Sequence, residues 1–207
     1  MDGWKAYTIG DPLSAKTQYP YRLDDEELMY PFYEKAVKAG ITNIAIHKGL
    51  MPADYETTWA GKWEYNTVWD VAKAAKDWPQ MNFIIYHSGM RPFLEDPSDV
   101  LAGFEKNGEL QWASELARMP AEHGVNNVYA ELGTTFANSC VTHPRLAAGM
   151  LGTLVKGLGA DRVVWGTDSV FYGSPQWQIE AMRRIEIPED MQEKHGFAPL
   201  GPADSLV

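Results

Sequence analysis

Two histidines and one aspartate stand at the ends of short apolar segments. The segment NIAIH ends in His47, NFIIYH ends in His87, and RVVWG is followed by Thr167 and Asp168. Neutral imidazole and carboxylate groups bind borderline cations such as zinc, and the cation lowers the pKa of a bound water to about 7. These residue types therefore indicate a metal site that activates water, provided that the fold brings the three segment ends together.

Each of these residues also has a purely structural interpretation. A histidine that ends an apolar strand is more often a hydrogen-bonded core residue than a ligand, and Asp168 alone would serve to cap the next turn. The joint pattern favours the metal, because three such groups would cost several kcal/mol to bury without a cation or partners. We therefore take His47, His87 and Asp168 as the candidate metal ligands.

The elements that must position these residues alternate along the chain. Strands are expected at residues 4–8, 43–47, 82–87, 127–132 and 162–166. Helices are expected at about 25–39, at 67–78 after a cap at Asn66, at 110–118, at 144–158 and from Ser174–Pro175 onward. This alternation indicates a parallel α/β architecture, in which the carboxyl ends of the strands share one face. We expect a single domain over residues 1–207.

Two further polar residues belong to the same strands. Lys5 lies within the first strand, and Glu131 lies near the end of the fourth, where it would be a rim group or a group that supports the residues at the site. The other histidines, at 123, 143 and 195, fall in loops, at a helix start or in the tail, so we interpret them as solvated. Cys140 and His143 share one loop, which is a weak signal for a thiol dyad.

Charge and composition exclude several functions. The 207 residues carry a formal net charge of −10, which would repel nucleic acid and anionic membranes. No apolar run approaches the ~20 residues that span a bilayer. The start MDGWKAYTIG lacks the pattern of a signal peptide, and Cys140 is the only cysteine. We expect a cytoplasmic protein that acts on a small molecule.

Four motifs around these residues resemble one known family. They are AIHKG at His47, IIYHSG at His87, VYAELG in the fourth strand and VVWGTDSVFYGSPQWQ at Asp168. Together they resemble the amidohydrolase-related (Amidohydrolase 2) branch of the metal-dependent hydrolase superfamily, which includes the aminocarboxymuconate-semialdehyde decarboxylase group. The resemblance implies an eight-stranded (β/α) TIM barrel. The five strands of this chain would correspond to barrel strands four to eight, which makes a partial barrel.

The resemblance also implies roles for single residues. His47 corresponds to a metal ligand, and Asp168 to a ligand that also accepts the proton of the water. His87 corresponds to a residue that acts on the bound water or substrate in mononuclear members and binds a second metal in binuclear ones. Lys5 falls where binuclear members carry a carboxylated lysine; its other roles would be pairing with a substrate carboxylate or stacking in the barrel.

The chain departs from this family pattern in its first half. The family's first strand carries a His-x-His pair that supplies two metal ligands, and this sequence contains no such pair. Strands one to three are absent, the last helix looks truncated, and a barrel of this kind needs about 250 residues. We expect a fragment, an abridged product or a chain completed by a partner. Weaker metal binding and homo-oligomers formed through unpaired sheet edges would follow.

The expected function is that of a metal-dependent hydrolase, with Asp168 and His87 as the catalytic residues. The divalent metal is expected to be zinc, with manganese and iron as the other candidates. Lys5, Glu131 and Trp63 are the candidate substrate-binding residues, the last because the segment MPADYETTWAGKWEYN after His47 is rich in aromatic residues that suit an apolar substrate. One alternative is a metal-dependent non-oxidative decarboxylase of an aromatic or unsaturated acid. The other is a non-catalytic fragment.

Overall fold

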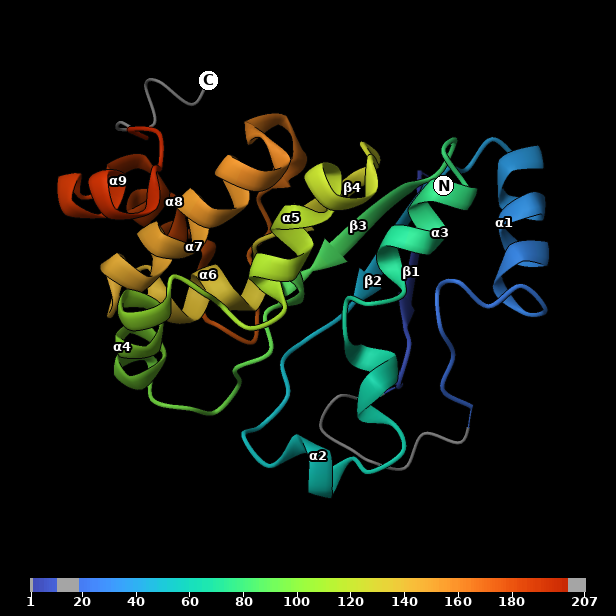
Figure 1. Ribbon diagram of the computed structural model, residues 1–207, viewed down its shortest axis with the longest axis horizontal. Coiled ribbons are helices and arrows are strands. Elements are labelled where there is room, and N and C mark those ends of the chain that lie inside the picture. The colour runs from blue at the N-terminus through green and yellow to red at the C-terminus, as the bar shows by residue number, and fades with distance from the viewer. Residues whose placement is uncertain (1, 11–18, 201–207) are drawn as a thin grey trace.

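Five short strands form one parallel sheet in the order of the sequence. They are β1 (Trp4–Tyr7), β2 (Asn43–His47), β3 (Asn82–Tyr86), β4 (Val128–Glu131) and β5 (Val163–Val164). The computed structural model describes residues 2–10 and 19–200, and within these residues β1 and β5 are the two edges of an open sheet. The expected partial barrel of parallel strand-helix units is therefore confirmed (Figure 1).

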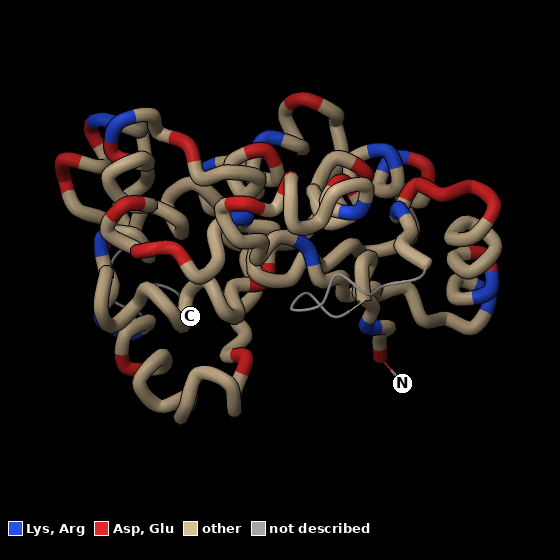
Figure 2. Tube along the Cα trace, turned by 90° about the horizontal axis from the view of Figure 1, so that it is seen from below, with Lys and Arg blue, Asp and Glu red and all other residues tan. Residues whose placement is uncertain are grey.

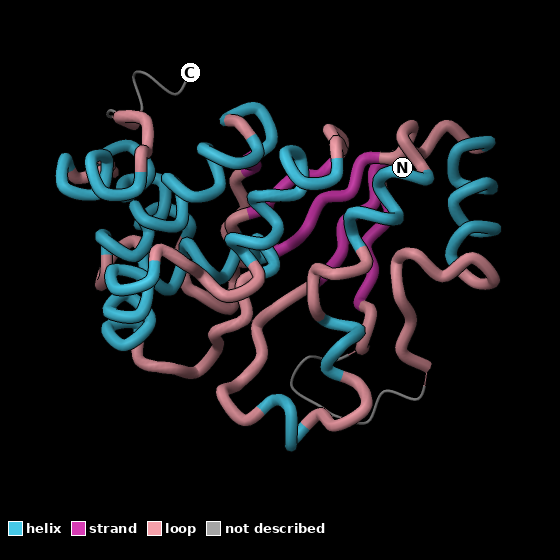
Figure 3. Tube along the Cα trace, in the orientation of Figure 1, coloured by secondary structure: helices cyan, strands magenta, loops and turns pink. Residues whose placement is uncertain are grey.

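Helices connect the strands and cover one face of the sheet (Figure 1). The α-helices are α1 (Met29–Lys38), α2 (Tyr55–Thr58), α3 (Val71–Asp77), α4 (Pro97–Asn107), α5 (Ala113–His123), α6 (Gly133–Ser139), α7 (Pro144–Leu158), α8 (Pro175–Arg184) and α9 (Glu189–His195). Three short 3-10 helices, η1 (Trp63–Asn66), η2 (His87–Gly89) and η3 (Ala160–Arg162), complete the elements that the described residues form. Long loops gather where the strands end (Figure 3).

Several local features differ from the sequence-based expectation. Asn66 does not cap α3, which begins at Val71 after Asp70; instead its side chain donates to the carbonyl of Gly49. Helices α4, α6 and α9 were not expected. The sequence signal for α4 is a loop-like Asp-Pro pair that turns out to be a helix start, because Asp96 accepts a hydrogen bond from the Ser98 backbone and Pro97 takes the first helical position.

The two faces of the sheet have different environments. Paired residues of parallel strands point to the same side, so the register separates an outer face from an inner one. The outer face lies beneath the helices and is fully buried at Ile44, Ile46, Phe83, Ile85, Val128 and Ala130. The inner face, which would fill a closed barrel, is partly exposed at Lys5, Tyr7, Ala45, Ile84, Tyr86 and Tyr129.

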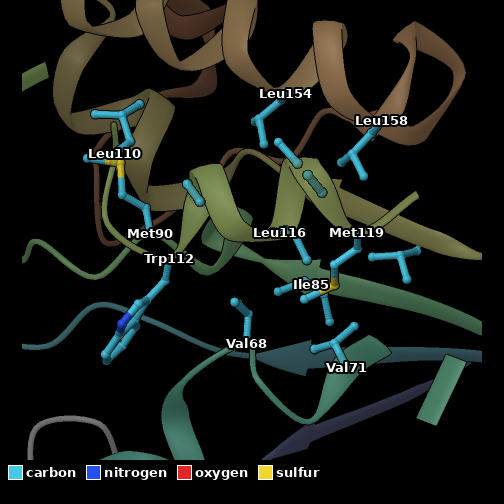
Figure 4. Packing of buried hydrophobic residues seen from close by; sticks show 14 of the residues in the cluster. Val68, Val71, Ile85, Met90, Leu110, Trp112, Leu116, Met119, Leu154 and Leu158 are labelled. Carbon is cyan, nitrogen blue, oxygen red and sulfur yellow. The ribbon is translucent and has the colours of Figure 1, made fainter. Parts of the chain in front are cut away.

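The hydrophobic core lies between the outer face and the helices. Ile85 of β3, Val71 of α3 and Met119 of α5 pack together there, and Leu154 and Leu158 of α7 cover the other side of α5 (Figure 4). Helix α1 extends this core through aromatic contacts, since the ring centroids of Tyr33 and Phe83 are 5.6 Å apart. The core therefore packs against the outer face of the sheet.

Charged residues are spread over the outside of the molecule. Acidic and basic residues are interspersed along the helices and loops, and no long basic stretch of chain is visible in Figure 2. No helix among the described residues has both the length and the apolar character that crossing a bilayer requires.

Candidate active site

A pocket of about 410 Å³ opens at the carboxyl end of the sheet. It brings together His47 from β2, His87 from the end of β3 and Asp168 from the segment after β5, as the sequence predicted for strands that share one face. The remaining lining residues among those described are Tyr7, Gly10, Leu50, Phe93, Thr134, Phe171 and Tyr172. The pocket therefore combines three polar residues, His47, His87 and Asp168, with aromatic and aliphatic lining residues.

His47 is held in place by ring contacts. Its ring centroid lies 4.7 Å from that of His87 and 5.0 Å from that of Tyr7, and only 4% of the residue is exposed. Burial lowers the pKa of His47 well below its usual value, and the charges of His87 and Lys5 lower it further. The ring is therefore neutral at pH 7, the form in which imidazole binds a metal.

His87 has a defined proton position. The backbone N–H of Thr134 donates to His87 Nδ1 over 3.2 Å, so the neutral ring carries its own proton on Nε2. Burial, reinforced by the nearby charge of Lys5, lowers the pKa of His87 to about 3. In this arrangement His87 offers a hydrogen-bond donor at Nε2 and has no free nitrogen lone pair for a metal.

Thr134 also holds the side chain of Asp168. The hydroxyl of Thr134 donates to Asp168 Oδ2 over 2.5 Å, so one threonine orients both His87 and Asp168. Asp168 has a φ of 49° and His87 a φ of 58°, a left-handed backbone conformation that costs free energy and often occurs at functional sites. Thr134 was not predicted as a site residue. The one feature of the sequence that points to it is its position just after the fourth strand.

Glu131 supports the pocket from below. It is 7% exposed, and its Oε2 accepts the backbone N–H of His87 over 3.2 Å. Burial raises the pKa of Glu131, although the hydrogen bond from His87 opposes this effect. A Cβ added at Gly166 would overlap Glu131 Oε1, so a larger residue there would displace this carboxylate from its present position. Glu131 thus positions the turn at His87 and does not itself line the pocket.

The other two candidate residues lie elsewhere. Lys5 is on the inner face of β1, with its Nζ 3.0 Å from the ring centroid of Tyr86, and burial lowers its pKa to about 8. Trp63 belongs to η1, where its ring contacts Tyr55 and Trp69 at centroid distances of 5.2 and 5.5 Å. Neither residue is part of the pocket lining, whose aromatic members are Tyr7, Phe93, Phe171 and Tyr172.

The donor set suits part of a divalent metal site. His47 contributes a buried neutral imidazole and Asp168 a carboxylate, which is the mixture that zinc and similar cations bind. Within the described residues, no group of three or more His, Cys, Asp or Glu side chains is placed to hold a metal ion. A catalytic zinc commonly has three protein ligands, so these two residues account for a portion of such a set.

Comparison with known proteins places the chain in a family. The model of the Amidohydrolase family (Amidohydro_2) matches residues 10–196, so the chain belongs to this family and the resemblance inferred from its motifs is confirmed. No curated protein matches the sequence.

Solved structures with the same fold are longer than this chain. An uncharacterized TIM-barrel protein from Bordetella bronchiseptica superposes with a TM-score of 0.53 at 17% identity, covering 86% of this chain and 51% of its own length. A candidate 2-pyrone-4,6-dicarboxylic acid hydrolase from Pseudomonas putida has a TM-score of 0.53 at 18% identity, covering 100% of this chain and 63% of its own length. The chain thus spans about half to two thirds of these TIM-barrel proteins, and the likeness supports the fold.

Proposed function

We propose that this chain carries part of the active site of a metal-dependent hydrolase that acts on a small molecule. The observation that carries the proposal is the convergence of His47, His87 and Asp168 on one pocket at the carboxyl end of a parallel sheet. Membership of the amidohydrolase family supports the same reaction class. His47 and Asp168 are the residues proposed to hold the metal, and zinc is the first candidate, followed by manganese and iron.

The proposed reaction divides the work between two side chains. A divalent metal in this position supplies charge that polarises a carbonyl and makes a bound water acidic. Asp168 accepts the proton of the attacking water at Oδ1, because its Oδ2 already accepts the Thr134 hydroxyl. The Nε2–H of His87 donates to the oxygen on which negative charge develops. Thr134 keeps both groups oriented before substrate binds.

The pocket walls suggest the kind of substrate. Leu50, Phe93 and Phe171 present apolar surface on the way to the three polar residues. Such walls favour a compact substrate with an aromatic or unsaturated body, and these polar residues would hold its carbonyl or carboxylate. Lys5 remains a proposed partner for a substrate carboxylate from the inner face of the sheet, with Glu131 beside it, whereas Trp63 would act only through the shape of the surrounding loops.

A non-oxidative decarboxylase is the second candidate. The observation that favours it is the aromatic and aliphatic lining beside His87 and Asp168, which suits an aromatic acid. A protonated group would then deliver a proton to the ring carbon. The third candidate, a non-catalytic fragment, is favoured by the lack of a third metal-binding side chain next to His47 and Asp168 among the described residues. The three candidates differ in metal content and in products.

Metal analysis of the purified chain combined with product assays tests the proposal. We expect metal in the wild-type chain after dialysis against limiting zinc, and at least a tenfold loss of bound metal in His47→Ala and Asp168→Ala, since each removes one of two ligands. His123→Ala is the matched control, because His123 is half-exposed and outside the pocket. The substrate panel contains esters, lactones and aromatic acids.

The outcomes separate the three candidates. Hydrolysis of an ester or lactone that falls with both variants supports the hydrolase. Carbon dioxide release from an aromatic acid favours the decarboxylase instead. A folded chain that binds no metal and converts no member of the panel contradicts the catalytic proposal and supports the non-catalytic fragment.

A further inference from the structure

The segment that ends in Asn66 is bound back to the residues just after His47. The backbone N–H of Gly49 donates to the Asn66 carbonyl over 2.9 Å, and Asn66 Nδ2 donates to the Gly49 carbonyl over 2.5 Å. Lys48 Nζ adds a bond of 2.7 Å to the carbonyl of Tyr65. Asn66 is fully buried, so these contacts fix its side-chain amide in one orientation. Because the amide nitrogen faces Gly49, the oxygen Oδ1 points away from Gly49.

Two buried polar atoms at this junction have complementary requirements. His47 Nδ1 and Asn66 Oδ1 are both inaccessible to solvent, and neither has a hydrogen-bond partner within the described part of the chain. An amide oxygen only accepts, whereas a neutral imidazole nitrogen either donates or accepts. Burial lowers the pKa of His47, so the ring is neutral and one of its two nitrogens carries a proton. The two orphaned atoms are therefore each other's natural partners.

We propose that Asn66 is a positioning residue whose Oδ1 accepts the Nδ1–H of His47. This bond selects one tautomer of a neutral histidine and leaves the lone pair of Nε2 free. The ring would then present a metal-binding nitrogen, while His87, held from the opposite nitrogen by Thr134, presents a proton. The importance of the tautomer for metal binding rests on the function proposed above, but the tautomer itself does not.

This assignment explains why the two neighbouring histidines would behave differently. Both rings are buried, neutral and in edge contact at 4.7 Å, so burial alone does not distinguish them. The distinction comes from the second nitrogen of each ring: a backbone N–H faces His87 Nδ1, and an amide oxygen is assigned to His47 Nδ1. A donor facing Nδ1 leaves the proton of His87 on Nε2, whereas an acceptor facing Nδ1 would hold the proton of His47 on Nδ1, so the two rings would be opposite tautomers.

Nitrogen NMR of the metal-free full chain tests the proposal directly. Long-range proton–nitrogen correlations show which ring nitrogen of each histidine carries the proton, and His47→Ala assigns the His47 signals. We expect His47 to be protonated at Nδ1 in the wild-type chain, and this preference to be lost in Asn66→Leu. Asn66→Asp keeps an acceptor oxygen and should restore the Nδ1–H form. Zinc affinity should fall roughly 10–100-fold in Asn66→Leu, as for other groups that orient a metal-binding histidine.

Asn127→Leu is the matched control. Asn127 is also a buried asparagine, but its Nδ2 donates to the carbonyls of Ala75, Trp78 and Met81, away from the pocket. Loss of this amide should reduce stability and leave the His47 tautomer unchanged. If Asn66→Leu does not fold, the wild-type spectrum still decides the matter.

Two results would overturn the proposal. One is a wild-type His47 protonated at Nε2, and the other is a folded Asn66→Leu chain in which His47 keeps its Nδ1–H. A chain that shows the expected tautomers yet binds no zinc would instead contradict the proposed function, with the role of Asn66 intact. The two ideas therefore fail in distinguishable ways.

Discussion

Thr134 joins two residues that come from different strands of the sheet. Its backbone N–H and its hydroxyl are used separately, the first for His87 and the second for Asp168. The sequence predicted three of the pocket residues, His47, His87 and Asp168, because their residue types and their positions at strand ends sufficed to place them on one face. It could not predict Thr134 or the contact of Asn66 with Gly49, because those depend on the path of the chain between the strands.

The low pKa of His87 predicts a pH-dependent stability. A histidine in the unfolded chain takes up a proton near pH 6.5, whereas the folded chain does so only near a pKa of about 3. The stabilisation is complete above pH 6.5 and is lost as the pH falls toward 3, by about 1.4 kcal/mol per pH unit. Urea unfolding of the metal-free protein at pH values between about 5 and 7 measures how the free energy of unfolding changes with pH. We expect this pH dependence to be weaker in His87→Gln than in the wild-type chain.

His123→Gln is the control for this experiment. Half of the His123 side chain is exposed, so its replacement should leave the pH dependence as in the wild-type chain. His47 is also buried with a lowered pKa, so part of the slope should remain in His87→Gln. An identical slope in His87→Gln and the wild-type chain would show that His87 is not buried in its neutral form.

The connection between β2 and α3 is built around a buried ion pair. Lys48 Nζ lies 2.8 Å from Asp70 Oδ2, and the two side chains are 0% and 1% exposed. Asp70 Oδ2 also accepts the backbone N–H of Leu23 over 2.8 Å, so this carboxylate ties together segments on either side of β2. The same Lys48 Nζ also donates to the carbonyl of Tyr65, the residue before Asn66, so the pair is linked to the segment that carries Asn66.

Removal of one member of this pair should be costly. We expect Lys48→Met to lower the free energy of unfolding by about 3–5 kcal/mol, because it leaves the Asp70 carboxylate buried without its cation. Lys38→Met is the control: it breaks a pair with Glu34 that is also 2.8 Å long but exposed to solvent, so its loss should change the free energy of unfolding little. Chemical denaturation measures both. Equal, small losses would mean that water reaches Asp70.

At this scale the sequence predicted all five strands but missed the helices α2, α4, α6 and α9. Strand β2 was expected at residues 43–47 and occurs there, because its apolar residues are bounded by polar ones on both sides. Asn66 was expected to cap the next helix, since asparagine favours that position. The long-range contact with Gly49 prevails over this local preference. Local patterns therefore identify the strands, and the start of α3 depends on a tertiary contact that no local pattern shows.

In the whole molecule one face of the sheet is covered by helices and the other is partly exposed. Helices bury the outer face of the sheet, while the inner face keeps Tyr7 at 44% exposure and forms a depression of about 310 Å³ around Lys5, Ile84 and Tyr86. In a closed barrel these residues would be packed in layers by the opposing strands. In the described residues the edges β1 and β5 also lack neighbours. The sequence predicted these open edges from the number of strands it contains.

An open, partly apolar sheet face should promote self-association. Unpaired strand edges are templates for pairing with another chain, so we expect a second copy of this chain to cover the inner face. Sedimentation velocity should show a concentration-dependent increase in mass. Ile84→Glu should weaken the association at least tenfold, which corresponds to about 1.4 kcal/mol, because it buries a charge in the contact. Leu28→Glu, at an exposed position before α1, should have no effect. A chain that stays monomeric at every concentration would show that the face is stable in water by itself.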